Sequence, residues 1–267
     1  MKLTLANQYL MINDKKLSYY ISSTDKQPEK SIVLLHGFCG SSAYYAKLIP
    51  LLEPKYQIIA FDLPGHGNSD AWDEENYDMK AVADFLQQAI SMLSLTNIHM
   101  FGHSLGGYIT LAYAEQFSGQ LASFGLLHST ALPDSEQAKQ NLLNAISFVQ
   151  KEGVKPFVEG LVGKLFGDDA KQQDMEHTYD IGLQTKPEAI IGFARGMRER
   201  ADRQQVIQAA AQPVMLISGA LDKIVTAEGT FSGRNETTVC HILEQAGHMG
   251  MLETPDALAK AITDFVG

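Results

Sequence analysis

The sequence contains only two cysteines, Cys39 and Cys240, among its 267 residues. Two cysteines are too few for a disulfide framework, and the Cys-x-x-Cys and Cys/His spacings of zinc sites do not occur, so we expect no bound metal and a reducing compartment. Long apolar runs are also missing. Polar residues interrupt the N-terminal segment before a signal-peptide core forms, and no run of about 18 apolar residues follows. These absences predict a cytoplasmic protein without a membrane-spanning segment.

Basic residues are scarce as well. The chain has 21 Lys and Arg residues against 31 Asp and Glu residues, which gives a formal net charge of −10. Such a field repels phosphate backbones and anionic lipids, and no stripe of Lys or Arg reverses it locally, so nucleic acids and membranes are not expected partners. Apolar residues make up 45% of the chain, enough for one main domain with a buried core.

Apolar runs bounded by turn residues alternate with amphipathic stretches in the first half of the chain. After a hairpin formed by residues 9–12 and 17–21, we expect strands over 31–35, 57–61, 98–101 and 121–127, and helices over 44–52, 79–93 and 106–117. Strands that are apolar throughout and alternate with helices are typical of a parallel sheet covered on both faces. The sequence therefore predicts an α/β fold with a mostly parallel twisted sheet.

Strand patterns return near the end of the chain, at residues 213–218 and 237–242. A final helix is expected over 255–266. Thr254 precedes this helix with a side chain suited to capping it, and Pro255 suits the first helical position.

Residues 132–212, between the two sets of strands, carry no strand pattern. They contain amphipathic helical stretches that are broken near Gly153 and Gly167. Because no linker or repeat sets this region apart, we expect it to pack on the sheet as an inserted helical cap. The predicted division is a core of residues 1–131 and 213–267 and a cap of residues 132–212.

A glycine-rich turn, GHSLGG at residues 102–107, follows a predicted strand and opens a predicted helix. This is the context that the nucleophile motif G-x-S-x-G requires. A turn this sharp strains and exposes Ser104, and the glycines on either side let neighbouring backbone approach. The N–H of Leu105, at the helix start, can then stabilise a developing oxyanion. The alternative is a strand-to-helix turn with an incidental serine.

A serine hydroxyl needs a base to take its proton and an acid to orient that base. Asp222 follows the strand at 213–218, and His248 follows the strand at 237–242, so the chain order is Ser, Asp, His. Side chains at the carboxyl ends of parallel strands can converge at one edge of the sheet. Asp134, beyond the strand at 121–127, is the alternative acid.

Four further motifs complete a pattern that resembles the α/β-hydrolase superfamily, in the branch that holds esterases, enol-lactonases, perhydrolases and carbon–carbon bond hydrolases. They are HGF at 36–38, DLPGHGNS at 62–69, SGALD at 218–222 and AGH at 246–248. The resemblance implies that the HGF turn lies at the substrate, with Gly37 beside it and the N–H of Phe38 completing an oxyanion hole with Leu105. It also implies that the DLPGHGNS turn is structural and that His36 orients the oxyanion loop.

Two other histidines lie near the predicted site. His103 precedes the nucleophile and His128 follows the strand at 121–127, so either can contact substrate; the alternative for each is a packed, hydrogen-bonded histidine. In the charged segment 195–203, Arg195 or Arg198 is a candidate anchor for a substrate carboxylate.

The sequence thus predicts a serine hydrolase that cleaves a small carboxylic ester or thioester through a Ser-His-Asp triad and an acyl-enzyme, without metal or organic cofactor. One alternative is a carbon–carbon bond or lactone hydrolase with the same triad. The other is a ligand receptor on the hydrolase scaffold that does not turn substrate over.

Overall fold

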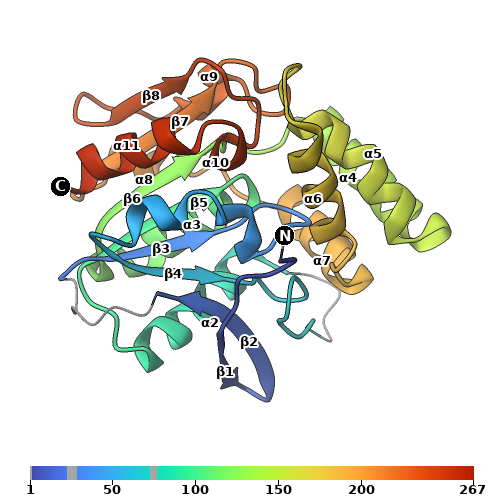
Figure 1. Cartoon of the computed structure of the whole chain (residues 1–267), viewed down its shortest axis with the longest axis horizontal. Coiled ribbons are helices and arrows are strands. Elements are labelled where there is room, and N and C mark those ends of the chain that lie inside the picture. Colours follow the sequence, from blue (N-terminus) through green and yellow to red (C-terminus); the bar gives the residue numbers. More distant parts are fainter. Residues whose placement is uncertain (1, 23–28, 73–76) are drawn as a thin grey trace.

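The computed structural model describes residues 2–22, 29–72 and 77–267. In these ranges one sheet of eight strands runs in the order β1-β2-β4-β3-β5-β6-β7-β8 (Figure 1). The strands are β1 (Gln8–Ile12), β2 (Lys15–Ile21), β3 (Ser31–Leu35), β4 (Gln57–Phe61), β5 (Ile98–His103), β6 (Leu121–Leu127), β7 (Val214–Gly219) and β8 (Val239–Leu243). Strands β1 and β2 are antiparallel to their neighbours, and all other pairs are parallel. The predicted α/β fold class is confirmed.

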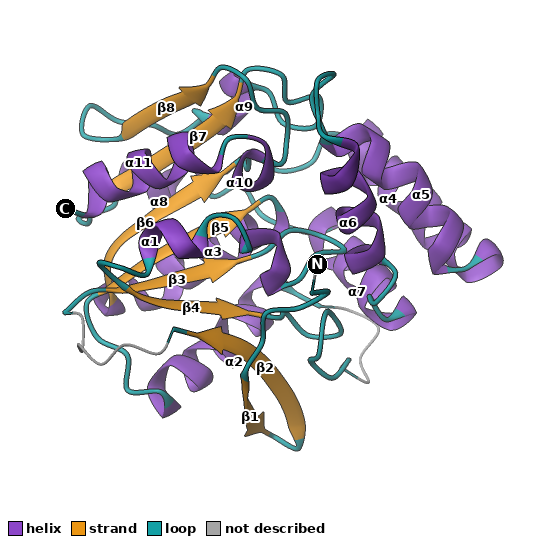
Figure 2. Ribbon diagram, in the orientation of Figure 1, coloured by secondary structure: helices purple, strands orange, loops and turns teal. Residues whose placement is uncertain are grey.

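Helices cover both faces of the sheet (Figure 2). One face packs against α2 (Met79–Met92), α3 (Leu105–Phe117) and α8 (Gln204–Gln208), and the other against α1 (Ile49–Leu52), α10 (Gly250–Glu253) and α11 (Pro255–Val266). Strand β3 shows why its sequence is apolar throughout. Val33 and Leu35 enter the first core, whereas Ile32 and Leu34 enter the second, because successive side chains point to opposite faces.

The crossover predicted as one helix over 44–52 is two short turns instead. A 3-10 turn, η1 (Ser42–Tyr45), is capped by the side chain of Ser41, and α1 begins separately at Ile49. Pro50 lies in the first turn of α1, where its missing N–H costs nothing, but it cannot continue a helix that began at Tyr44. The prediction was therefore wrong about continuity.

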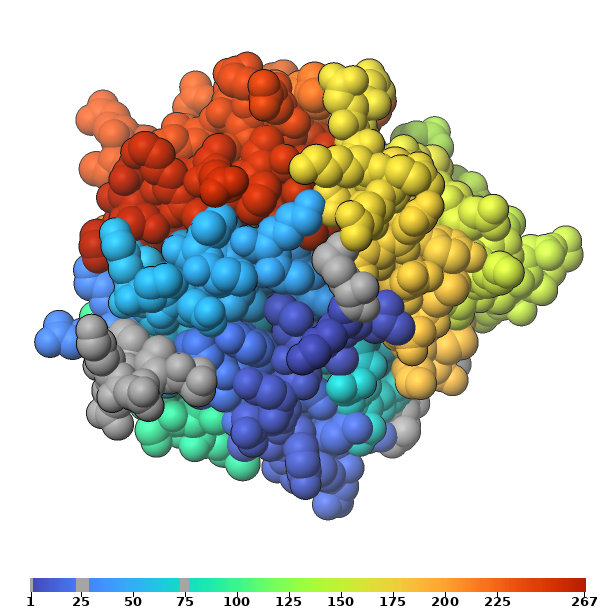
Figure 3. Space-filling model, viewed as in Figure 1, coloured from blue at the N-terminus to red at the C-terminus, as the bar shows by residue number. Residues whose placement is uncertain are grey.

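Five helices lie between β6 and β7, and the first four of them form one side of the molecule beside the C-terminal segment (Figure 3). These four are α4 (Glu136–Glu152), α5 (Val154–Leu165), α6 (Gln172–Gly182) and α7 (Pro187–Arg198). Helix α4 packs on α5 and α7, and α5 packs on α6, whereas α8 already contacts α3. The division into core and cap stays a prediction.

The remaining short elements are η2 (Ser118–Gln120) and α9 (Ala227–Thr230). At the last helix, Pro255 occupies the first turn as expected, but the predicted cap was wrong. Thr254 makes no capping bond, because its hydroxyl donates to the carbonyl of Gly250 at 3.3 Å. Within the described ranges, no helix has the length and apolar character needed to cross a bilayer.

Candidate active site

Ser104 lies at the turn between β5 and α3 with φ 50° and ψ −115°, a conformation that strains an L-residue. The turn is possible because its neighbours lack side chains. A Cβ atom added to Gly102 would lie 2.1 Å from the carbonyl oxygen of Gly106, and one added to Gly106 would lie 2.1 Å from that of Leu35. The tight backbone leaves Ser104 partly exposed between buried residues.

Gly106→Ala is expected to lower the free energy of unfolding by about 3 kcal/mol, because the new methyl group meets backbone that cannot move aside cheaply. The measurement is urea denaturation. Gly163→Ala is the matched control: nothing lies within 4 Å of its added Cβ in α5, so the change is expected to stabilise by about 0.5 kcal/mol. Equal unfolding midpoints for the two variants would contradict the packing argument.

Asp222 and His248 come together beyond the ends of β7 and β8. Nδ1 of His248 donates to Oδ2 of Asp222 at 2.8 Å, while Oδ1 accepts the N–H groups of Ile224 and Val225 at 2.8 and 2.9 Å. With its proton on Nδ1, His248 presents Nε2 as an acceptor. Burial alone would raise the pKa of Asp222, but contacts with His128 and His248 and the N–H of Val225 hold it well below its usual range. The carboxylate therefore stays ionised.

Ser104 and His248 line one cavity of about 600 Å³. Among the described residues no hydrogen bond joins the Ser104 hydroxyl to His248, a contact that often tightens only with substrate. The alternative acid, Asp134, lines the same cavity but pairs with Arg200 at 2.6 Å. The structure thus brings Asp222, and not Asp134, to His248.

The oxyanion loop is held by two buried histidines. Nδ1 of His36 donates to the carbonyl of Gly37 at 2.8 Å, so the N–H of Phe38, across the same trans peptide, points the opposite way. Nε2 of His66 accepts the N–H of Cys39 at 3.3 Å. Burial lowers the pKa of His36 to about 4 and that of His66 to about 3, so both rings stay neutral and can keep these roles.

Two backbone N–H groups remain available beside Ser104. The N–H groups of Phe38 and Leu105 donate to no group in the described part of the chain. Phe38 lines the cavity, and Leu105 begins α3, whose positive dipole end favours an anion. The arrangement can stabilise an oxyanion that forms on a group attacked by Ser104.

The other three predicted residues occupy different places. A Cβ added to Gly37 would lie 3.2 Å from Cβ of Ser104, so this glycine lies against the nucleophile. His103 lines the cavity, but its Nε2 donates to the carbonyl of His248 at 2.8 Å. His128 is fully buried behind the acid, with Nδ1 3.5 Å from Oδ2 of Asp222. His128 is not among the residues that line the cavity.

Comparison with known proteins agrees with this architecture. A family model described as alpha/beta hydrolase fold matches residues 30–255. The chain belongs to the α/β-hydrolase-fold family.

Relatives of this α/β hydrolase include esterases. It is 28% identical to the pimeloyl-[acyl-carrier protein] methyl ester esterase of Neisseria meningitidis serogroup C, over 89% of this chain and 93% of that protein. A thermophilic esterase from Thermogutta terrifontis superposes with a TM-score of 0.88 at 26% identity, covering 94% of this chain and 93% of that one. A third relative is the dihydrolipoyllysine-residue acetyltransferase component of the acetoin cleaving system of Pseudomonas putida. The two proteins are 27% identical over 88% of this chain, and the match spans 63% of the length of the Pseudomonas protein.

Within the described ranges of this α/β hydrolase, no three His, Cys, Asp or Glu side chains are grouped so that they could hold a metal ion.

The predicted carboxylate anchors, Arg195 and Arg198, are not among the residues that line the cavity, and Arg198 lies 3.4 Å from Glu199. Arg200 does line it. The sequence did not distinguish Arg200 from its charged neighbours, because burial depends on how the segment packs.

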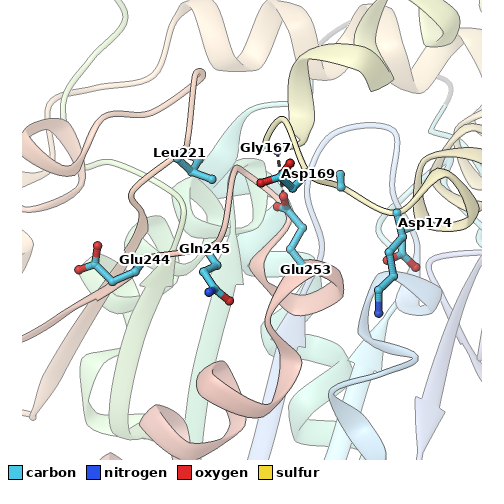
Figure 4. Close-up of a pocket in the computed structure, with 9 residues that line it drawn as sticks. Gly167, Asp169, Asp174, Leu221, Glu244, Gln245 and Glu253 are labelled. Carbon is cyan, nitrogen blue, oxygen red and sulfur yellow. Dashed lines mark hydrogen bonds between the residues drawn. The ribbon is translucent and has the colours of Figure 1, made fainter.

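Sequence reasoning also missed Glu253, which supports the His248 loop from a second pocket (Figure 4). Its Oε2 accepts the N–H groups of Gly247 and Met249, both at 3.0 Å, and its Oε1 accepts that of Gly167 at 2.8 Å. The N–H of His248 itself donates to the carbonyl of Leu165 at 2.8 Å. One carboxylate thus joins both neighbours of His248 to the end of α5.

Glu253→Gln is expected to reduce stability by about 2 kcal/mol, because an amide offers only one acceptor oxygen for three N–H groups. Since Glu253 does not line the cavity, kcat should fall about tenfold through displacement of His248 while KM changes little. Steady-state kinetics and urea denaturation measure the two effects. Glu244→Gln, an exposed carboxylate of the same pocket, is the control, and equal behaviour of both variants would remove the positioning role.

Proposed function

We propose that this α/β hydrolase is a serine hydrolase that cleaves small carboxylic esters or thioesters, with Ser104, His248 and Asp222 as its triad. The observation that carries the proposal is that a strained, partly exposed Ser104 and His248 line the same cavity. The hydrogen bond from His248 to Asp222 fixes the tautomer of His248. That is the arrangement a serine needs to become a nucleophile.

The reaction proceeds by acyl transfer. Nε2 of His248 takes the proton as Oγ of Ser104 attacks the carbonyl carbon, and the N–H groups of Phe38 and Leu105 bind the resulting oxyanion. The tetrahedral intermediate collapses when the C–O or C–S bond breaks, and His248 gives its proton to the leaving alcohol or thiol. Water then attacks the acyl-enzyme, His248 takes its proton, and Ser104 is released with the acid product.

The charges around the triad support this sequence of proton transfers. Ionised Asp222 stabilises the imidazolium that His248 becomes during each step. Burial, with the neighbouring His248 and His128, lowers the pKa of His103 well below its usual range, and burial also lowers that of His128. Both neighbouring rings therefore stay neutral and do not compete for the positive charge.

The cavity supports a small substrate with apolar parts. Its volume of about 600 Å³ is that of a small-molecule site, and most of its lining is apolar. The apolar lining includes Phe38, Leu132, Leu142, Phe157, Leu161 and Met197. Relatives whose names record ester hydrolysis point to the same bond type.

A fluorophosphonate probe and a substrate panel test the proposal together. Rapid labelling of Ser104, with turnover of p-nitrophenyl or thioesters of graded acyl length, is the expected result. Labelling without turnover of any ester would favour the receptor alternative. Turnover confined to a lactone or to a carbon–carbon bond substrate would replace the ester assignment while keeping the triad.

A further inference from the structure

An ion pair between a buried arginine and a partly buried aspartate forms part of the wall of the substrate cavity. Nη1 of Arg200 lies 2.6 Å from Oδ2 of Asp134, and the two side chains are 4% and 16% exposed. The guanidinium carbon of Arg200 lies 4.0 Å from the centre of the Tyr108 ring, and its Nη2 donates to the carbonyl of Leu132 at 2.8 Å. All four residues line the cavity.

The pair lies close to the reacting serine. Tyr108 is one helical turn along α3 from Ser104, and both line the same cavity as Arg200, so a substrate that fills this cavity from Ser104 can reach Arg200. An arginine at this distance would attract a carboxylate on the substrate if its charge were free. Asp134 already supplies the opposite charge.

Apart from Arg200, Lys223 is the one lysine or arginine that lines the described part of the cavity, and it is paired as well. Its Nζ lies 2.5 Å from Oδ1 of Asp168. Because the Lys223 side chain is 57% exposed, solvent also screens its charge. A carboxylate entering the cavity would therefore lose its water without gaining a free cation, and it would meet Asp134 as a like charge.

We propose that Asp134 is a specificity determinant: by pairing with Arg200 it makes the cavity select esters whose acyl and alcohol groups are uncharged and reject esters that carry a carboxylate. This inference rests on the proposed ester hydrolysis for its substrate class. It assigns Asp134 a role in selection in place of the triad role weighed from the sequence.

The test compares neutral and anionic esters that differ only by a methyl group in place of the carboxylate. One pair is p-nitrophenyl hexanoate and mono-p-nitrophenyl adipate, and the other is 4-methylphenyl acetate and 4-carboxyphenyl acetate, so that the carboxylate is offered on either side of the ester bond. The wild-type protein is expected to prefer the neutral member by about tenfold or more in kcat/KM, the factor that 1.4 kcal/mol of unpaired charge burial corresponds to.

Asp134→Asn frees the Arg200 charge and is expected to raise the anionic-to-neutral ratio by about 10 to 100-fold in at least one pair. The double variant D134N/R200M removes the cation as well and is expected to return the ratio to its wild-type value. Glu115→Gln is the matched control, because Glu115 also pairs with a buried arginine, Arg203 at 3.2 Å, but lies outside the cavity. Its ratio should stay at the wild-type value.

Each other result decides against the proposal. A wild-type preference for the anionic ester, or an unchanged ratio in Asp134→Asn, overturns it, and an equal loss on both esters would make the pair a structural tether. If Asp134→Asn does not fold, calorimetric binding of hexanamide and adipamic acid to Ser104→Ala decides, since equal affinities overturn the inference. Absence of hydrolysis of every ester would reject the proposed function, and the same binding comparison would still test the selection.

Discussion

Ser104→Ala is expected to lower kcat/KM for p-nitrophenyl butyrate by about 10⁴-fold or more, because triad members act as one unit and little catalysis survives the loss of one. The fold should remain intact, since alanine leaves the backbone turn between β5 and α3 unchanged. Stopped assays at high enzyme concentration measure the residual rate, and mass spectrometry measures loss of fluorophosphonate labelling.

The control for this change is another serine. Ser91→Ala alters an exposed position of α2 and should leave both the rate and the labelling at their wild-type values. Turnover by Ser104→Ala at the wild-type rate would show that a different group attacks the substrate. Residual labelling at another residue would identify that group.

Asp222→Asn is expected to lower kcat by about 10⁴-fold. The amide oxygen of asparagine must accept the N–H groups of Ile224 and Val225, which leaves its NH₂ group facing Nδ1 of His248. The imidazole then carries its proton on Nε2 and cannot take one from Ser104. Kinetics across neutral pH measure the loss.

The pH dependence of the wild-type enzyme follows from the same geometry. Because the pKa of Asp222 is held well below its usual range, Asp222 stays ionised as pH falls, so its protonation does not set the acid limb of the activity profile. A loss in Asp134→Asn as large as that in Asp222→Asn would transfer the acid role to Asp134.

Elements with local signals were predictable from the sequence. Strands β3, β4 and β6 have the predicted bounds, because each is an apolar run that ends at turn-forming residues. The elbow was equally clear, since only glycine at 102 and 106 permits the turn that holds Ser104. The loops carrying Asp222 and His248 also lie where the strand order placed them, beyond β7 and β8.

Features that depend on contacts between distant segments could not be predicted from the sequence. Arg200 and Asp134 are separated by four helices, and nothing in their local patterns shows that they meet in the cavity wall. In the sequence, Glu253 does not differ from a surface glutamate, because the three N–H groups that it accepts, those of residues 167, 247 and 249, are brought to it only by the fold. Such contacts follow from the packing of whole elements, which periodicity does not encode.

The chain leaves the sheet for the inserted helices and returns to it at nearly the same point, where the N–H of Arg203 donates to the carbonyl of Ala131 at 2.9 Å. A loop whose two ends touch can change length cheaply, since each doubling adds only about 0.6 kcal/mol of closure entropy. The segment between these two residues can therefore tolerate replacement by a segment of another length. Grafting a segment of different length there would remodel the substrate-facing wall while the elbow of Ser104 keeps its position, and the graft would have to retain the carbonyl of Leu165 and the N–H of Gly167, which hold the His248 loop.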